Sequence, residues 1–276
     1  MQKLLYGAIA LSCMLASWPG HAAPEQERQE LLQFFQERFP GIALEEYVHG
    51  ALMLSADAKS QYDSIMEFPP FQGEISRGER LWKQRFANGG SFADCFPNGG
   101  LNVAGNYPYY DVESDRVVTF EMAINRCLRE NGEATFRYDD RETMGVLTAY
   151  ARTLSDGMRL NVRVDSPGAV RKYRAGKAFY YRRIGQLNLA CASCHINHAG
   201  NYFRDELISP GLGQPAHFPV FRGGENLNTL HMRYQRCMEA MRAVPFAAGG
   251  EELNNLEYFH SYISNGLPLK ASVYRK

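Results

Sequence analysis

The sequence predicts a mainly α-helical protein in which two similar domains follow one another along the chain. Apolar side chains recur at helical spacing in several segments, and a faint repeat relates the two halves at a period of about 100 residues. A Ser-Pro-Gly turn signal at residues 166–168 separates them. With 276 residues, of which 45% are hydrophobic and 22% charged, the chain can build a packed core and is not disordered. Its 30 basic and 30 acidic side chains argue against nucleic acid as a partner, because binding to phosphates needs surplus positive charge.

Residues 1–22 are typical of a secretory signal peptide. A positively charged start precedes an apolar stretch from Leu4 to Trp18, and small residues follow. This stretch is too short for a stable membrane anchor; a retained membrane helix and a lipoprotein signal at Cys13 are the alternatives. We therefore expect cleavage after Ala22 or Ala23, a periplasmic location and a mature chain without a membrane span.

Three apolar stripes predict helices in the mature chain. The first ends before Pro40, the second before Asp156-Gly157, and the third at Asn265-Gly266. The stripes consist of Leu31, Phe34, Phe35 and Phe39, of Met144, Leu147, Tyr150, Ala151 and Leu154, and of Leu253, Leu256, Phe259 and Ile263. The segment 160–165 is a short strand or an extended connection. We place a boundary after it, which gives domains at 23–165 and 166–276.

The most specific motif is Cys191-Ala192-Ser193-Cys194-His195, the C-x-x-C-H sequence to which c-type haem is attached. Two thiols three positions apart can reach the two vinyl groups of one haem, and His195 then lies under the iron as the proximal ligand. A redox-active or structural disulfide beside a histidine is the alternative. The motif predicts one covalently bound haem c and a cytochrome c-like C-terminal domain.

Spacing alone leaves the second axial ligand open among cysteine, methionine and histidine. The candidates downstream are His217, His231, Met232, Cys237, Met238 and Met241. Cys237 is the cysteine left over if Cys191 and Cys194 form thioethers and Cys95 pairs with Cys127. A thiolate is also a competent haem ligand.

The segment 229–242 is predicted to be a helix that Thr229 caps. Arg233 and Cys237 are four residues apart and so share one face. A cation one turn from a cysteine favours the thiolate and attracts an anionic substrate to the sulfur. The alternative partner of Arg233 is a haem propionate or a surface carboxylate.

The N-terminal half reads as a copy of the C-terminal half that has lost its haem site. The segment Gly78–Trp82 precedes Cys95 much as Gly176–Tyr180 precedes Cys191, and each half carries another cysteine further on. The residues next to Cys95 include no second cysteine and no histidine, so they cannot hold a porphyrin covalently. Cys95 and Cys127 are then a disulfide candidate in an exported protein, with two free buried thiols as the alternative.

Six cations and no acid lie between Arg171 and Arg183. One interpretation is an electropositive rim that attracts an anion or an acidic partner protein. The other is a solvated helix face with propionate partners. The six are Arg171, Lys172, Arg174, Lys177, Arg182 and Arg183.

Several runs resemble the SoxA family of bacterial sulfur oxidation. The first is Tyr180–His195, which includes the C-x-x-C-H motif. The others are Phe218–Arg222, Arg233-x-x-x-Cys237 and Arg242–Phe246, in the same order as in the family. The resemblance is dense from about Tyr173 to the C-terminus and thinner from Gly78 to Cys127.

The resemblance implies two cytochrome c-like domains in tandem, a SoxX-like monohaem cytochrome as partner, and oxidative conjugation of thiosulfate to a cysteine of the SoxY carrier in SoxYZ. By motif match, His195 is the proximal and Cys237 the distal haem ligand. Cys237 is also the site of chemistry and can become a persulfide, while Arg233 assists substrate binding. Because C-x-x-C-H is missing near Cys95, the chain resembles the single-haem branch, with an N-terminal domain without haem and a Cys95–Cys127 disulfide.

Two other functions remain open at this point. One is a plain electron-transfer cytochrome in which Cys237 is only an axial ligand, and the other is a scaffold with a structural haem. We expect Cys237 to carry sulfur covalently, with Arg233 and part of the 171–183 segment holding the anion.

Overall fold

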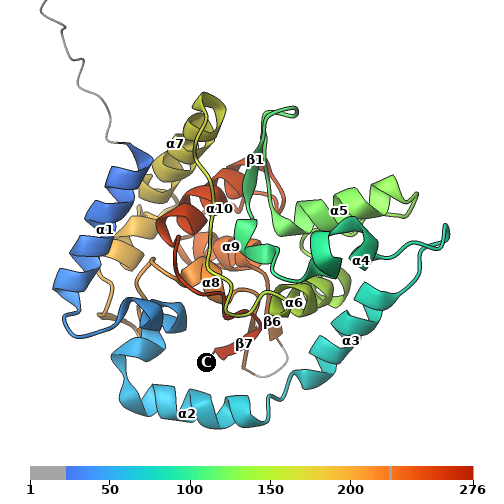
Figure 1. Cartoon of the computed structure of the whole chain (residues 1–276). Helices are drawn as coiled ribbons and strands as arrows, with labels where there is room; N and C mark the ends of the chain where they lie inside the picture. The colour runs from blue at the N-terminus through green and yellow to red at the C-terminus, as the bar shows by residue number, and fades with distance from the viewer. Residues whose placement is uncertain (1–22, 224–225, 276) are drawn as a thin grey trace, which may run out of the picture.

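The structure is a computed structural model that describes residues 23–223 and 226–275 (Figure 1). The predicted signal peptide, with Cys13, lies outside the described residues. The helices are α1 (Pro24–Arg38), η1 (Leu44–Leu54), α2 (Ala56–Glu67), α3 (Gln72–Lys83), α4 (Phe92–Cys95), η2 (Pro97–Gly100), η3 (Ala104–Asn106), α5 (Phe120–Glu130), η4 (Arg141–Gly145), α6 (Val146–Thr153), α7 (Pro167–Tyr181), η5 (Ser193–Asn197), α8 (Gln214–His217), α9 (Leu230–Ala240) and α10 (Glu251–Ile263). Across the described residues, no helix is both long and apolar enough to cross a membrane.

Short strands make up the rest of the regular structure. They are β1 (Tyr109–Asp111), β2 (Arg116–Val118), β3 (Tyr202–Phe203), β4 (Glu206–Leu207), β5 (Val220–Arg222), β6 (Asn226–Asn228) and β7 (Val273–Arg275). β1 and β2 form one antiparallel hairpin, and β3 and β4 form another. In the three-stranded sheet, β5 pairs with β6 antiparallel and with β7 parallel, so that Val220 lies opposite both Asn228 and Val273. The protein is therefore mainly helical, as the sequence predicts.

The predicted helices are confirmed, with small differences at their ends. α1 begins at Pro24 and ends at Arg38, just before Pro40. The stripe that begins at Met144 divides into the π-helical turn η4 and the helix α6. The segment 160–165 is an extended connection without a strand, and its backbone is fixed by Asn265, whose side-chain oxygen accepts from the Val162 amide (2.8 Å).

The crossing of α7 and α10 organises the C-terminal half (Figure 1). Gly176 faces the backbone of α10, where a Cβ at this position would overlap the carbonyl oxygen of Asn255. On the same surface, Tyr173 and Tyr180 of α7 each place their rings 5.3 Å from the ring of Phe259. The absence of a side chain at residue 176 thus allows the two helices to approach until their aromatic residues interlock.

A similar crossing of α3 and α6 lies in the N-terminal half. Gly78 faces the carbonyl oxygen of Val146, again without room for a Cβ. Trp82, one turn after Gly78, is buried and packs against Phe92 and Phe96. The two glycines are the ones that the sequence repeat pairs, so the repeat marks the same kind of helix contact in both halves.

The order of elements after each crossing helix is also alike. A hairpin of two short strands leads to a threonine that caps the next helix: Thr119 accepts from Met122 before α5, and Thr229 accepts from Met232 before α9. The cysteine of each helix comes eight residues after its threonine. The capped helix predicted from Thr229 is confirmed.

The first helix packs against the C-terminal half, far along the sequence. Figure 1 shows α1 beside α7, and Glu27 of α1 pairs with Lys177 at 2.8 Å and accepts from the Tyr173 hydroxyl at 2.9 Å. Arg38 donates to the carbonyl of Ala199 at 2.9 Å. One continuous apolar core joins residues of both halves. The boundary after residue 165 stays a prediction.

Gly176→Ala should lower the free energy of unfolding by about 3 kcal/mol, because the added methyl group forces α7 and α10 apart. Gly73→Ala is the matched control, since that position on α3 is exposed and has nothing near its Cβ. We expect the control to be neutral or to stabilise by about 0.5–1 kcal/mol through helix propensity. Denaturant unfolding of both variants measures the difference, and equal effects at the two positions would contradict this account of the crossing.

Candidate functional site

The C-x-x-C-H motif lies on a short helical segment that ends in the π-helical turn η5. The side chain of Ser193 caps the start of this segment by accepting from the Ala190 amide at 3.0 Å. Cys191 and Cys194 are free thiols in the structure, so it does not contain the disulfide that was the alternative interpretation of the motif.

The ring of His195 is oriented by the backbone. Its Nδ1 lies 2.9 Å from the carbonyl oxygen of Ser209, which can only accept, so Nδ1 carries the proton and Nε2 keeps its lone pair. The Gln214 amide nitrogen also lies 2.9 Å from Nδ1 and donates to Ser209 Oγ. Burial lowers the pKa of His195, which favours the neutral form. A neutral imidazole with a fixed Nδ1–H is the form that ligates metals through Nε2.

The two thiols of the motif lie within electrostatic range of a third, that of Cys237. Burial, together with the neighbouring Cys237 and Cys194, raises the pKa of Cys191 to about 12. Burial and Cys237 also raise the pKa of Cys194. Cys237 lies on α9, 43 residues after Cys194 in the sequence, and the fold brings its thiol to the C-x-x-C-H motif.

A buried hydroxyl at the same place has no partner. Tyr180 Oη is buried without a hydrogen bond among the described residues, and the pKa of Tyr180 is raised by burial and by the three cysteines nearby. A polar atom left unpaired in the interior is costly unless a further group occupies the site. Two thiols, a fixed imidazole, a third thiol and an unpaired hydroxyl together fit a covalently attached haem.

Both histidine alternatives for the second axial ligand are engaged elsewhere. His217 Nδ1 bonds to the carbonyl oxygen of Val48 at 2.9 Å. His231 Nδ1 accepts from the Gly249 amide at 3.0 Å, and its Nε2 lies 3.0 Å from a carboxylate oxygen of Glu257. Cys237 is the candidate with a recorded influence on the motif, since its charge affects the pKa of both Cys191 and Cys194.

A chain of hydrogen bonds links the Cys237 helix to the His195 segment. The Tyr234 hydroxyl on α9 donates to His260 Nδ1 at 2.8 Å, and His260 Nε2 donates to the Gly211 carbonyl at 2.7 Å. The Gly211 amide then donates to the carbonyl of His195 at 2.8 Å. Burial lowers the pKa of His260 to about 3, so this ring is neutral and can donate and accept at once. The chain holds α9 at a fixed distance from the motif.

Arg233 lies one turn before Cys237, as predicted, and near a second arginine that the sequence analysis did not single out. Glu206 on β4 contacts both cations, with 3.0 Å to Arg222 and 3.8 Å to Arg233. Arg222 stands at the end of the Phe218–Arg222 run, where the sequence offered a signal only through family resemblance. Nothing in the sequence pointed to Glu206, because a two-residue strand is too short to show an alternating pattern.

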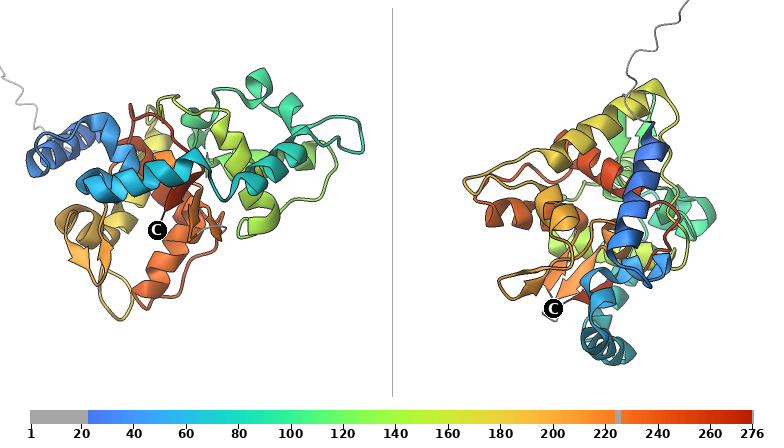
Figure 2. Two further views of the ribbon diagram at one scale, coloured as in Figure 1. Left: turned by 90° about the horizontal axis from the view of Figure 1, so that it is seen from below. Right: turned by 90° about the vertical axis from the view of Figure 1, so that its left-hand side faces the viewer.

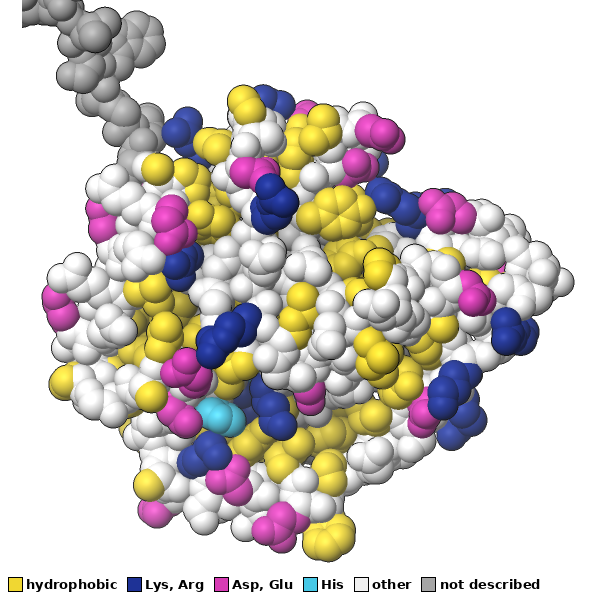
Figure 3. Space-filling model, in the orientation of Figure 1, with side chains coloured by type: hydrophobic (Ala, Val, Ile, Leu, Met, Phe, Trp, Pro, Cys, Tyr) yellow, Lys and Arg dark blue, Asp and Glu magenta, His cyan; other side chains and the backbone are white. Residues whose placement is uncertain are grey.

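Three of the six cations of the 171–183 segment pair with carboxylates of other elements. Arg171 pairs with Asp115 at 3.2 Å, Lys172 with Glu251 at 2.9 Å, and Lys177 with Glu27 at 2.8 Å. Arg182 covers the ring of Phe179. On the face shown in Figure 3, basic and acidic side chains are interspersed. The solvated helix face therefore describes Arg171, Lys172 and Lys177, and a role of the remaining cations in holding the anion stays a prediction.

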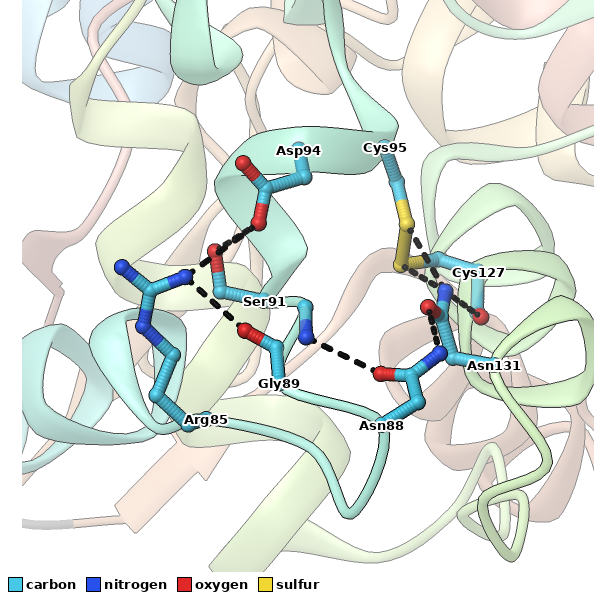
Figure 4. A network of polar contacts seen from close by, with 9 residues as sticks. Arg85, Asn88, Gly89, Ser91, Asp94, Cys95, Cys127 and Asn131 are labelled. Carbon is cyan, nitrogen blue, oxygen red and sulfur yellow. Dashed lines mark hydrogen bonds and ion pairs between the residues drawn. A yellow bond between two sulfur atoms is a disulfide. The ribbon is translucent and has the colours of Figure 1, made fainter.

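The N-terminal counterpart of the site holds a disulfide between Cys95 and Cys127 (Figure 4). The side-chain amide of Asn131 donates to the Cys127 carbonyl at 2.9 Å, and its oxygen accepts from Asn88 at 2.8 Å. Arg85 donates to the carbonyl of Gly89, the residue after Asn88, at 3.0 Å. Both cysteines of residues 23–165 are thus part of the crosslink.

Comparisons with known proteins agree on one family. Residues 77–160 match the family described as SoxA/TsdA, cytochrome c domain. The chain is 41% identical to "L-cysteine S-thiosulfotransferase subunit SoxA" of Chlorobaculum tepidum, over 99% of this chain and 97% of the relative. It is 39% identical to the protein of that name from Allochromatium vinosum, over 92% and 91%.

A solved structure is also similar. The crystal structure of SoxXA from P. pantotrophus superposes with a TM-score of 0.69 and 28% identity, over 75% of this chain and 79% of that chain. The cytochrome c domain, the C-x-x-C-H motif and the geometry around it agree that the protein binds haem c covalently. The chain belongs to the SoxA family.

Proposed function

We propose that this chain is the SoxA subunit of a periplasmic L-cysteine S-thiosulfotransferase. It would pair with a SoxX-like monohaem cytochrome c and join thiosulfate to a cysteine of a SoxYZ carrier. The observation that carries this proposal is the placement of Cys237, with Arg233 one turn away, beside the C-x-x-C-H motif. The names of the relatives support the activity, and the similarity to a SoxXA crystal structure supports the partner.

The contacts at the site support a set of residues that would hold the haem. Cys191 and Cys194 would attach it through thioethers, and His195 Nε2 and the Cys237 sulfur would supply its proximal and distal ligands. When bound, the haem supplies one-electron redox chemistry, with axial ligands as the main determinant of its potential. The Tyr234–His260–Gly211 chain would keep Cys237 and His195 at a fixed separation around the haem.

We also propose that the two halves are cytochrome c-like domains in tandem, with 23–165 as the haem-free copy and 166–276 as the haem-binding copy. The two glycine-mediated helix crossings and the two threonine-capped helices support this arrangement. The family match to residues 77–160 supports it further, because the matched cytochrome c domain lies in the half that lacks C-x-x-C-H. The Cys95–Cys127 disulfide takes the place of a cofactor in stabilising that half.

The proposed reaction has two steps, and each step forms one S–S bond. The Cys237 thiolate and the outer sulfur of thiosulfate form a Cys237–S–S–SO3⁻ adduct, and two electrons leave in successive one-electron steps toward the SoxX-like partner. The carrier thiol then loses its proton to solvent, and its thiolate attacks the outer sulfur of the adduct. The S–SO3 group passes to the carrier, and Cys237 leaves as a thiolate. The persulfide form of Cys237 stays a prediction.

Mass spectrometry tests this route directly. The haem-loaded complex, oxidised by a cytochrome c acceptor and given thiosulfate without carrier, should gain a thiosulfonate on the peptide that contains Cys237. The mass increase should vanish on treatment with a thiol reductant. The same measurement shows whether Cys191 and Cys194 carry one haem and whether Cys237 carries an extra sulfur beforehand.

The Cys237→Ser chain is the control for this measurement, and it should gain no adduct. If the complex consumed thiosulfate in the presence of carrier while Cys237 stayed unmodified at every stage, the covalent route would be wrong. Cys237 would then be an axial ligand of a plain electron-transfer cytochrome.

A further inference from the structure

Two arginines from different elements share a single carboxylate beside Cys237. Arg222 ends β5, Arg233 lies on α9, and Glu206 belongs to the β3–β4 hairpin. One oxygen of Glu206 is 3.0 Å from Arg222 Nη2, and the other is 3.8 Å from Arg233 Nη2. We call this pair of guanidinium groups the two-arginine site.

The two cations are held more firmly than the anion between them. The side chains of Arg222 and Arg233 are 29% and 30% exposed, whereas that of Glu206 is 54% exposed. The β3–β4 hairpin pairs with no other strand in the described structure, and Figure 2 shows it at the edge of the molecule in both views. A carboxylate on such a hairpin can leave with little loss of packing, while the arginines stay.

The two-arginine site also needs an anion. Burial lowers the pKa of Arg222, and the charge of Arg233 nearby lowers it further, while Glu206 and Cys237 act in the opposite direction. Two guanidinium groups held this close repel one another unless a negative group lies between them. Because Cys237 is among the groups that affect Arg222, the site lies within electrostatic range of that sulfur.

We propose that the two-arginine site binds the sulfo group of the anionic substrate and that Glu206 occupies it until the substrate displaces the carboxylate. Arg222 is thereby a second substrate-binding residue beside Arg233. This inference rests on the proposed function and adds a residue and a competitor to it. Guanidinium groups recognise tetrahedral oxyanions through paired N–H donors.

Charge counting favours displacement over joint binding. Thiosulfate carries two negative charges, which two arginines neutralise fully, whereas Glu206 neutralises only one of them. With both anions present, the site would hold three negative charges against two positive ones. The dianion should therefore expel Glu206, and the outer sulfur, which carries no oxygen, is left to face Cys237.

Calorimetric titration of thiosulfate into the oxidised, haem-loaded complex without carrier tests the proposal. Arg222→Gln should weaken binding by about tenfold or more, because it removes a charge-assisted contact. Glu206→Gln should tighten binding by about threefold or more, because it removes the competing charge without altering the shape. Sulfate, which has the same charge and sulfo oxygens, should compete for the site.

Arg236→Gln and Glu239→Gln are the matched controls. These residues form an exposed ion pair at 3.0 Å on the same helix α9, and their variants should bind thiosulfate as the native complex does. Arg222→Lys keeps the charge and should fall between the native chain and Arg222→Gln, which separates a binding role from damage to the fold. The haem absorbance of each variant checks that the site is intact.

The proposal is overturned if Arg222→Gln and Glu206→Gln bind thiosulfate as the controls do, or if Glu206→Gln binds it more weakly. A different result would show that the proposed function itself is wrong. In that case Cys237 forms no adduct with thiosulfate, while binding to the complex still depends on Arg222 and Glu206.

Discussion

The Cys237→Ala variant should retain haem and the SoxX-like partner and yet lose thiosulfate conjugation by about three orders of magnitude or more. Haem should be retained because the residues proposed for its attachment, Cys191, Cys194 and His195, are unchanged by the substitution. Turnover is lost because no other free thiol at the site can carry the S–SO3 group once two cysteines are thioethers. Steady-state reduction of an electron acceptor with thiosulfate and carrier present measures the loss.

Cys237→Met is the variant that separates the two roles of this residue. A thioether can bind haem iron but cannot form the disulfide-type bond with thiosulfate. We expect Cys237→Met to show a haem spectrum with methionine as axial ligand and to be as inactive as Cys237→Ala. Activity in Cys237→Met would mean that the residue serves only as a ligand, and the chain would then be an electron carrier.

The local parts of the site could be predicted because each depends on residues near one another in sequence. The C-x-x-C-H run fixes two thiols and an imidazole on one turn, and Thr229 starts a helix that places Arg233 and Cys237 on one face. Counting cysteines identified the pair Cys95 and Cys127, which the structure joins. These inferences needed only helical geometry and the chemistry of sulfur.

The parts that could not be predicted depend on contacts across long separations. Glu206, Arg222 and Arg233 come from a hairpin, a sheet and a helix, and no periodicity in the sequence relates them. The hydrogen bonds of His260 to Tyr234 and Gly211 also join residues that are far apart in sequence. The pairing of three of the 171–183 cations could not be predicted for the same reason: their acidic partners, such as Glu27, lie far away in sequence.

Removing the Cys95–Cys127 disulfide should lower the free energy of unfolding by about 3–4 kcal/mol, as measured by denaturant titration of the Cys95→Ser/Cys127→Ser variant. The crosslink closes a loop across a sequence separation of 32 residues, which restricts the unfolded chain. It also ties α4 to α5 beside the buried side chains of Trp82 and Phe96, in the half of the chain that has no C-x-x-C-H motif.

Haem attachment and the Cys237 adduct should survive in this variant, because the residues proposed for both lie beyond residue 166. The native protein treated with a reductant should match the double variant. A loss below about 1 kcal/mol would mean that packing of α3, α5 and α6 alone holds the N-terminal half. Loss of haem would mean that the two halves fold as one unit through their shared core.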